Sequence, residues 1–238
     1  MPVAEEIAQR QGFEPWFNTE GKVIGWQTQD SSPFSPRRPI IIFHGNAGYA
    51  LHRTNYQSYL GNEWQVKILE YPGFGVREGR PSEEVLVAAA AEAVVDLIRR
   101  GHEDIFLLGE SLGTGVAAAV AARFPKAVRG MVFVTPFTSL ADVAASQFPF
   151  LPVRTVLRDR YESSVNLRSY GGPLFVLIAG QDEVVPKELG IQLYNDFEGP
   201  KELIVLETAT HNTILSASTR DIWNDIVQFF IDQQDFSE

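Results

Sequence analysis

The chain has 238 residues, a length that suits one large domain, and its 45% hydrophobic and 21% charged residues are ordinary for a folded globular protein. Its formal net charge of −10 argues against a nucleic-acid backbone or an anionic membrane surface as partner, because both are bound through an excess of Lys and Arg. The absence of cysteine excludes disulfides, thiolate catalysis and cysteine-ligated metals.

The N-terminal residues, MPVAEEIAQRQGF, lack the basic and apolar regions that define a signal peptide. The longest apolar stretch, residues 85–98, contains Glu92 and Asp96 and is shorter than the roughly 20 residues that span a membrane. We therefore expect a cytoplasmic protein without a membrane span.

Apolar runs typical of strands alternate with runs typical of helices along the chain. The predicted strands cover residues 13–17, 22–28, 39–45, 65–71, 104–109, 130–136, 173–180 and 202–207. The predicted helices follow Pro81, cover residues 112–124 and 187–197, and end with a helix at about residues 219–232. The first two strands are expected to pair antiparallel.

The later predicted strands are apolar on both faces and are separated by helices, a pattern typical of a parallel sheet covered on both sides. We therefore predict a single α/β domain over residues 1–238. Its expected core is a mostly parallel, twisted sheet of about eight strands with helices on both faces. In such sheets the loops at the carboxyl ends of the strands carry the ligands, so candidate functional residues are sought there.

Ser111 is the central residue of GESLG, residues 109–113, between the predicted strand 104–109 and a helix rich in small residues. This is the G-x-S-x-G pattern in the strand–turn–helix setting of a nucleophile elbow. Such a tight turn leaves no room for a Cβ at either flanking glycine and exposes the serine hydroxyl above the sheet edge. We predict Ser111 to be a nucleophile. The alternative is that it only caps the helix.

A serine hydroxyl needs a base within hydrogen-bond reach, and the base needs a carboxylate that orients it. In folds with this elbow the three residues follow the chain order Ser, acid, His. His211 is the one histidine after Ser111, and it lies in the loop that follows the last predicted strand. We therefore predict His211 to be the base, with an exposed loop histidine as the alternative.

Asp182 lies two residues after the end of the predicted strand 173–180 and between the nucleophile and the base in the chain. We predict it to be the acid that orients His211. Glu183 beside it and Asp142 after the strand 130–136 are the alternatives. Asp182 could also serve instead as a cap for the helix that begins near residue 186.

A tetrahedral intermediate is stabilised by two preorganised N–H donors. The first is expected to be the amide of Leu112, because it directly follows the predicted nucleophile. The second is expected to be the amide of Asn46 in the loop HGNAG, residues 44–48, whose small residues let the backbone approach a substrate. The alternative for this loop is a glycine-rich turn that binds no ligand.

Residues 135–171 lie between two predicted strands, where we expect a small cap insertion. Phe137, Phe148 and Phe150 are predicted to supply the apolar wall of an acyl pocket. Tyr71, in another loop at a carboxyl strand end, is predicted to contact the substrate too. The alternative is that these aromatic residues only pack the cap onto the body of the protein.

Three arginines, Arg154, Arg158 and Arg160, lie in the same insertion. They could bind a substrate carboxylate, but we expect them to form surface ion pairs, as most exposed arginines do.

Several stretches together resemble the α/β-hydrolase superfamily, and within it the Bem-type hydrolases, a branch that includes protein-depalmitoylating serine hydrolases. They are HGNAG from His44, YPGFG from Tyr71, EGRPSE from Glu78, GESLGTGVA from Gly109, TPFTSLADVA from Thr135, FPFLPV from Phe148, RDRY from Arg158 and DEVVP from Asp182. They fall within residues 39–212, most of the chain. Thr210 is a departure, because relatives often carry glycine before the histidine. The resemblance implies esterase or thioesterase activity and leaves the acyl group open.

The sequence therefore predicts a serine hydrolase that cleaves a carboxylic ester or thioester of a small molecule through an acyl-enzyme intermediate. This chemistry requires no metal or cofactor. One alternative is a peptidase or amidase that uses the same three residues. Another is a ligand-binding relative that has kept the fold without turnover.

Overall fold

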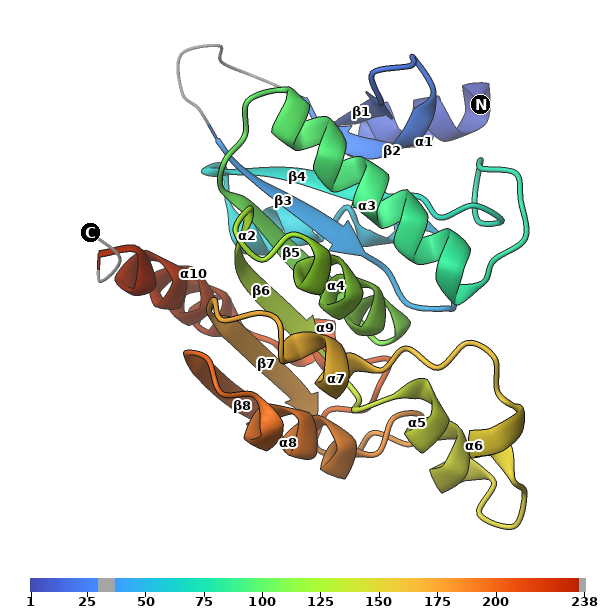
Figure 1. The fold of residues 1–238 in the computed structure, drawn as a ribbon. Coiled ribbons are helices and arrows are strands. Elements are labelled where there is room, and N and C mark those ends of the chain that lie inside the picture. The colour runs from blue at the N-terminus through green and yellow to red at the C-terminus, as the bar shows by residue number, and fades with distance from the viewer. Residues whose placement is uncertain (30–36, 236–238) are drawn as a thin grey trace.

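The computed structural model describes residues 1–29 and 37–235 and has one eight-stranded sheet at its centre (Figure 1). The strands are β1 (Phe13–Phe17), β2 (Val23–Thr28), β3 (Arg38–Phe43), β4 (Trp64–Leu69), β5 (Ile105–Glu110), β6 (Val128–Val134), β7 (Leu174–Ala179) and β8 (Lys201–Leu206). Their order across the sheet is β1-β2-β4-β3-β5-β6-β7-β8. β1 pairs antiparallel with β2, and β2 with β4, whereas the other neighbours pair parallel. The predicted fold class is confirmed.

Helices cover both faces of this sheet (Figure 1). They are α1 (Pro2–Arg10), the 3-10 helix η1 (Ala50–Arg53), α2 (Tyr56–Leu60), α3 (Glu83–Arg99), α4 (Leu112–Arg123), α5 (Leu140–Gln147), α6 (Val153–Val156), α7 (Ser163–Leu167), α8 (Lys187–Asp196), α9 (Ile214–Ala217) and α10 (Arg220–Asp235). One core cluster lies between the sheet and α3, α4, α7 and α8, and the other between the sheet and α1, α2 and α10.

The helix α3 shows how the local sequence produces this packing. Its first turn is stabilised by the Ser82 hydroxyl, which accepts a hydrogen bond from the Val85 amide at 3.3 Å, and by acidic residues near the positive end of the helix dipole. Leu86, Ala90 and Leu97 recur at helical spacing and are buried against the sheet. Burying each leucine side chain contributes about 1.5–3 kcal/mol, so packing of this face fixes the helix in place.

The strands β3, β5, β6, β7 and β8 run in the same direction, so the loops after them meet at one edge of the sheet. β5 and β7 are buried almost throughout, which agrees with their continuous apolar sequences. The rigid strands thereby bring together, in space, loops that lie far apart in the sequence.

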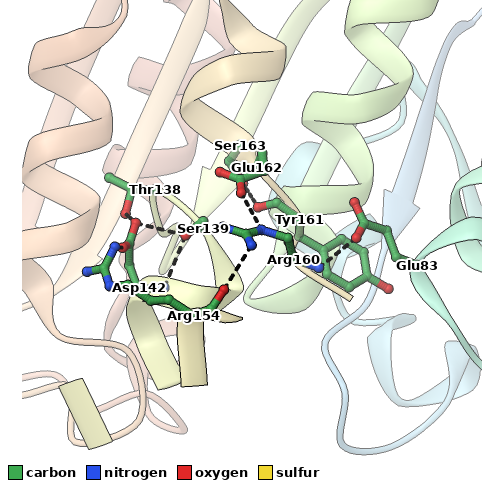
Figure 2. Close-up of polar contacts among 9 residues, drawn as sticks. All are labelled: Glu83, Thr138, Ser139, Asp142, Arg154, Arg160, Tyr161, Glu162 and Ser163. Atoms are coloured by element: carbon green, nitrogen blue, oxygen red, sulfur yellow. Dashed lines mark hydrogen bonds and ion pairs between the residues drawn. The ribbon is translucent and has the colours of Figure 1, made fainter. Parts of the chain in front are cut away.

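The connection between β6 and β7 contains the short helices α5, α6 and α7 and extends away from the sheet (Figure 1). Figure 2 shows its polar contacts: the Arg154 guanidinium pairs with Asp142 at 2.5 Å, and the Arg160 guanidinium pairs with Glu162 at 2.7 Å. The backbone amide of Arg160 also donates to the Glu83 carboxylate at 2.7 Å, which ties this connection to the start of α3.

Within the described ranges 1–29 and 37–235, the helices are too short or too polar for any of them to cross a lipid bilayer.

Candidate active site

The turn between β5 and α4 holds Ser111 in a backbone conformation that is rare for a residue other than glycine, with φ 54° and ψ −118°. Its amide donates to the Val134 carbonyl of the neighbouring strand at 2.9 Å, and its carbonyl accepts the Thr114 hydroxyl at 2.7 Å. The Ser111 side chain forms no capping hydrogen bond with α4. The hydroxyl is therefore not used as a helix cap.

Two glycines make this turn sterically possible. A Cβ on Gly109 would lie 2.6 Å from the carbonyl oxygen of Gly113. A Cβ on Gly113 would overlap the backbone carbonyl of Phe43 at the end of β3. The start of α4 can thus pass directly over the sheet, which leaves Ser111 above the strand ends and half-buried.

Asp182 and His211 are joined by a hydrogen bond of 2.7 Å between Oδ2 of the aspartate and Nδ1 of the imidazole. The Asp182 side chain is 2% exposed and the His211 side chain is 15% exposed, so the bond is largely shielded from water. In the described part of the chain no hydrogen bond joins this ring to the Ser111 hydroxyl.

The loops that carry Asp182 and His211 are held together by their backbones. The amide of Gly180 donates to Leu206 at 2.9 Å, and the amide of Gln181 donates to Ala209 at 2.9 Å. Gly180 packs so tightly against the second loop that a Cβ on it would lie 2.6 Å from the Cα of Glu207. The glycine in the sequence AGQD is therefore required by the approach of the two loops.

The three carboxylates considered for the orienting acid have different contacts in the structure. Oδ1 of Asp182 accepts the amides of Val184 and Val185, at 2.9 and 2.7 Å, while Oδ2 binds His211. One oxygen thus holds the turn and the other holds the ring, whereas we expected one of these roles to exclude the other.

The two alternatives for the acid lie in different surroundings. Glu183 is exposed. Asp142 accepts hydrogen bonds from the hydroxyls of Thr138 and Ser139 and pairs with Arg154 (Figure 2). Partial burial raises the pKa of Asp142, but these hydrogen bonds and the arginine outweigh it and hold the pKa below its usual value. Asp142 therefore fixes the start of α5.

The predicted oxyanion loop lies against the elbow. Asn46 is exposed at the tip of the loop, and a Cβ on its neighbour Gly45 would lie 3.3 Å from the Cβ of Ser111. Leu112 is the first residue of α4, so its amide has no partner within the helix. Within the described residues, the amides of Asn46 and Leu112 form no hydrogen bonds, so both can donate to a bound anion.

A partly buried ion pair that the sequence analysis missed stabilises this arrangement. Arg53 forms two hydrogen bonds of 2.6 Å with the carboxylate of Glu110, the residue before Ser111. Their side chains are 17% and 15% exposed. Although burial lowers the pKa of Arg53, Glu110 raises it further, so the guanidinium stays charged. The pair links the elbow to η1, which directly follows the oxyanion loop.

A second buried contact holds the other side of the same loop. Glu70 is 1% exposed, and its Oε1 accepts the Ala50 amide at 3.1 Å and lies 3.6 Å from Nε2 of His44. Nδ1 of His44 lies 2.7 Å from the Gly45 carbonyl oxygen. These groups fix the backbone on either side of Asn46 and lie away from the solvent.

A pocket of about 320 Å³ opens beside Ser111. It is lined by Asn46, Phe74, Pro81, Ser82, Leu86, Ser111, Leu112, Phe137, Leu140, Val143, Asp159, Tyr161, Val184 and Val185. Most of these side chains are apolar, and a few polar groups converge among them, which is the usual composition of a small-molecule site. The predicted nucleophile and both predicted oxyanion residues belong to this lining.

The four predicted substrate-binding residues do not all line this pocket. Phe137 is buried and lines the pocket. Phe148 and Phe150 are 56% and 98% exposed, between α5 and α6, and lie outside the pocket lining, so their predicted place in the pocket wall is not what the structure shows. Tyr71 is fully buried and packs on the His44 ring, 4.4 Å between centroids, so it supports the oxyanion loop from behind.

Tyr161 and Asp159 line the pocket, and the sequence analysis did not select them. Tyr161 has φ 42°, and with Ser111 and Thr135 it is one of the non-glycine residues with positive φ within the described ranges. Strained backbone of this kind gathers at functional sites. Gly115 makes room for it, because a Cβ there would lie 2.7 Å from the Tyr161 Cβ. The signal in the sequence was Gly115, a small residue one turn into α4 that leaves space for Tyr161.

The described residues contain no cluster of three or more His, Asp or Glu side chains that could hold a metal ion.

Comparisons with known proteins identify the family and the fold. A family model described as alpha/beta hydrolase fold matches residues 38–163. An uncharacterized protein of Mycobacterium tuberculosis is 36% identical over 177 residues, which cover 73% of this chain and 62% of the relative. The lysophosphatidylserine lipase ABHD12 of Rattus norvegicus is 31% identical over 202 residues, which cover 76% of this chain and 50% of that protein. The chain thus matches only about half to three fifths of the length of these relatives.

Among solved structures, an esterase from Exiguobacterium antarcticum superimposes with a TM-score of 0.65 at 15% identity. The alignment covers 90% of this chain and 97% of that one. At this identity the likeness concerns the fold alone.

We expect the substitution Gly113→Ala to lower the free energy of unfolding by more than about 3 kcal/mol, because the new Cβ would meet the Phe43 backbone, which cannot move without disturbing β3. Denaturant unfolding measures the change. Gly171→Ala is the matched control, since a Cβ there meets nothing within 4 Å, and it should change stability by less than about 1 kcal/mol. Equal stability of the two variants would contradict the close approach of α4.

Proposed function

Because this chain belongs to the α/β-hydrolase fold family, we propose that it is a serine hydrolase that cleaves carboxylic ester or thioester bonds of small molecules. The observation that carries the proposal is the shielded hydrogen bond between Asp182 and His211, at the sheet edge where Ser111 lies in its strained turn. In the proposed site this arrangement supplies an oriented base at the same sheet edge as the serine hydroxyl.

In the proposed reaction, the Ser111 hydroxyl attacks the carbonyl carbon of the substrate while His211 accepts its proton through Nε2. For this transfer the imidazole must come within hydrogen-bond reach of the hydroxyl. Asp182 accepts the Nδ1 proton, which fixes the tautomer and stabilises the ring when it becomes charged.

The negative charge that develops on the carbonyl oxygen is received by the amides of Asn46 and Leu112, with the positive end of α4 beneath them. The imidazolium then returns its proton to the leaving alcohol or thiol, and an acyl-enzyme on Ser111 remains. Water, deprotonated by His211, releases the acid and restores the serine. Every proton in this cycle is carried by side chains of the chain or by water.

The pocket and the relatives support an ester rather than an amide substrate. Phe137, Leu140 and Val143 give the pocket an apolar wall that suits an acyl chain. The rat relative is named as a lipase, an enzyme that acts on lipid esters. The alternative is an amidase that acts through the same residues, and an anilide substrate distinguishes it from an esterase.

We expect wild-type protein to be labelled covalently by a fluorophosphonate probe and to hydrolyse p-nitrophenyl butyrate. The variant Ser111→Ala should show neither property and should keep its thermal unfolding temperature, since the hydroxyl makes no structural hydrogen bond with α4. Gel fluorescence and steady-state kinetics measure the two effects. An unlabelled, inactive wild type would overturn the proposed function, and retained turnover in the variant would exclude Ser111 as nucleophile.

We expect Asp182→Asn to lower kcat by about 10³–10⁴-fold, because the amide cannot hold the His211 ring in the required tautomer. Glu183→Gln is the matched control: the neighbouring carboxylate is exposed, and its loss should change kcat by less than about twofold. Steady-state kinetics with p-nitrophenyl butyrate compare the two variants. The reverse ranking would identify Glu183 as the orienting acid.

The cavity of about 320 Å³ lies at the small end of ligand pockets, so we expect a preference for short and medium acyl chains. Along a p-nitrophenyl ester series, kcat/KM should rise by up to about fourfold for each added methylene, the factor equivalent to about 0.8 kcal/mol, and then fall once the pocket is full. Acyl-thioesters and an anilide complete the set. A higher kcat/KM for the anilide than for the esters would overturn the esterase proposal.

A further inference from the structure

The pocket beside Ser111 contains a second polar group of residues besides the proposed catalytic ones. Ser82, Asp159 and Tyr161 all belong to its lining. Ser82 and Asp159 lie at the start of α3, where the Ser82 hydroxyl accepts the Val85 amide at 3.3 Å and Oδ1 of Asp159 accepts the Glu83 amide at 3.1 Å. The proposed reaction uses none of these three side chains.

Asp159 brings a negative charge to this part of the pocket. It is half-buried, and one of its two carboxylate oxygens, Oδ2, has no hydrogen-bond or ion-pair partner among the described residues. Tyr161 lies close enough for the two groups to interact electrostatically. Burial and the charges of Asp159 and Glu83 raise the pKa of Tyr161, so its hydroxyl stays protonated and can donate. A carboxylate and a residue whose hydroxyl can donate therefore line the same cavity.

The arginines nearby lie outside the lining of the pocket. Arg154 is paired with Asp142 and Arg160 with Glu162, and the Arg160 guanidinium also donates to the Arg154 carbonyl at 2.9 Å (Figure 2). Arg158 and Arg123 line a neighbouring surface hollow that Asp159 lines too. Among the described residues, neither arginine forms an ion pair with Asp159. The pocket lining, as far as the structure describes it, contains no lysine, arginine or histidine. The negative charge of Asp159 is thus not balanced within the pocket.

We propose that Asp159 determines the substrate class of this site: it selects esters whose alcohol part carries no negative charge, whether neutral and hydroxyl-bearing or cationic, and it rejects anionic head groups. The inference rests on the proposed hydrolase function and deepens it. A hydroxyl or ammonium group of the alcohol is attracted to the Asp159 carboxylate, whereas a phosphate is repelled by it. The net charge of −10 acts in the same direction on approach.

This selectivity would distinguish the chain from the relatives named for lysophosphatidylserine, a lipid whose head group contains a phosphate. A purely structural role for Asp159, securing the start of α3, predicts no such selectivity. The two roles can be separated, because Asn at this position can still accept the Glu83 amide while it removes the charge.

The test compares three butyrate esters with the same acyl group: butyrylcholine, monobutyrin and butyryl-glycerol phosphate. For the wild type we expect kcat/KM for the first two to exceed that for the phosphate ester by about tenfold or more. Asp159→Asn should reduce the ratio between butyrylcholine and the phosphate ester by about tenfold. A loosened α3 would instead lower all three values together and leave the ratio unchanged.

Asp104→Asn is the matched control, because it removes a carboxylate that is 55% exposed and paired with Arg129 at the start of β5. It should leave the ratio unchanged. A wild type that cleaves the phosphate ester as well as the others, or an Asp159→Asn ratio equal to that of the control, would overturn the inference. Calorimetry measures binding of the three esters to Ser111→Ala, with and without Asp159→Asn, and so reports the same selectivity without turnover. Because this measurement does not depend on activity, an inactive wild type would count against the proposed function alone.

Discussion

The close approach of α4 to the carboxyl ends of β3 and β5 is the constraint on which the rest of this site depends. It is possible because Gly109 and Gly113 have no Cβ, and it forces Ser111 into a left-handed backbone conformation. The same contact brings the first amide of α4 next to the loop that carries Asn46. One steric condition thus sets the position of the proposed nucleophile and of both proposed oxyanion donors.

Buried charges on either side keep these loops from relaxing. Arg53 and Glu110 connect the elbow to η1, and Glu70 holds the Ala50 amide where the oxyanion loop ends. Removing one partner of such a pair would leave an uncompensated buried charge, so the strained turn is maintained by interactions that are costly to break. Asp182 acts similarly in its own loop, because it holds two turn amides and the His211 ring at once.

The sequence alone predicted the sheet and its strands, because hydrophobic periodicity is a local signal. The tight glycine turn is a local signal as well, and it is the basis on which Ser111 is proposed as the nucleophile. It could not place Phe148, Phe150 or Tyr71, since the side that a loop residue faces depends on packing between distant segments. The pair of Arg53 and Glu110 was not predicted for the same reason, because its partners are 57 residues apart in the chain. Asp159 was not selected, because the sequence RDRY carries no local signal of the cavity that this residue lines.

The order of the strands has a consequence for how the protein is made. Ser111 and Asn46 come from the first half of the chain, whereas Asp182 and His211 follow β7 and β8, which are synthesised later. Parallel strands pair only after long loops have closed, so such contacts form late in folding. While only the residues up to the elbow have emerged from the ribosome, the nascent chain contains the serine without its base. The proposed chemistry could begin only after the last strand had docked.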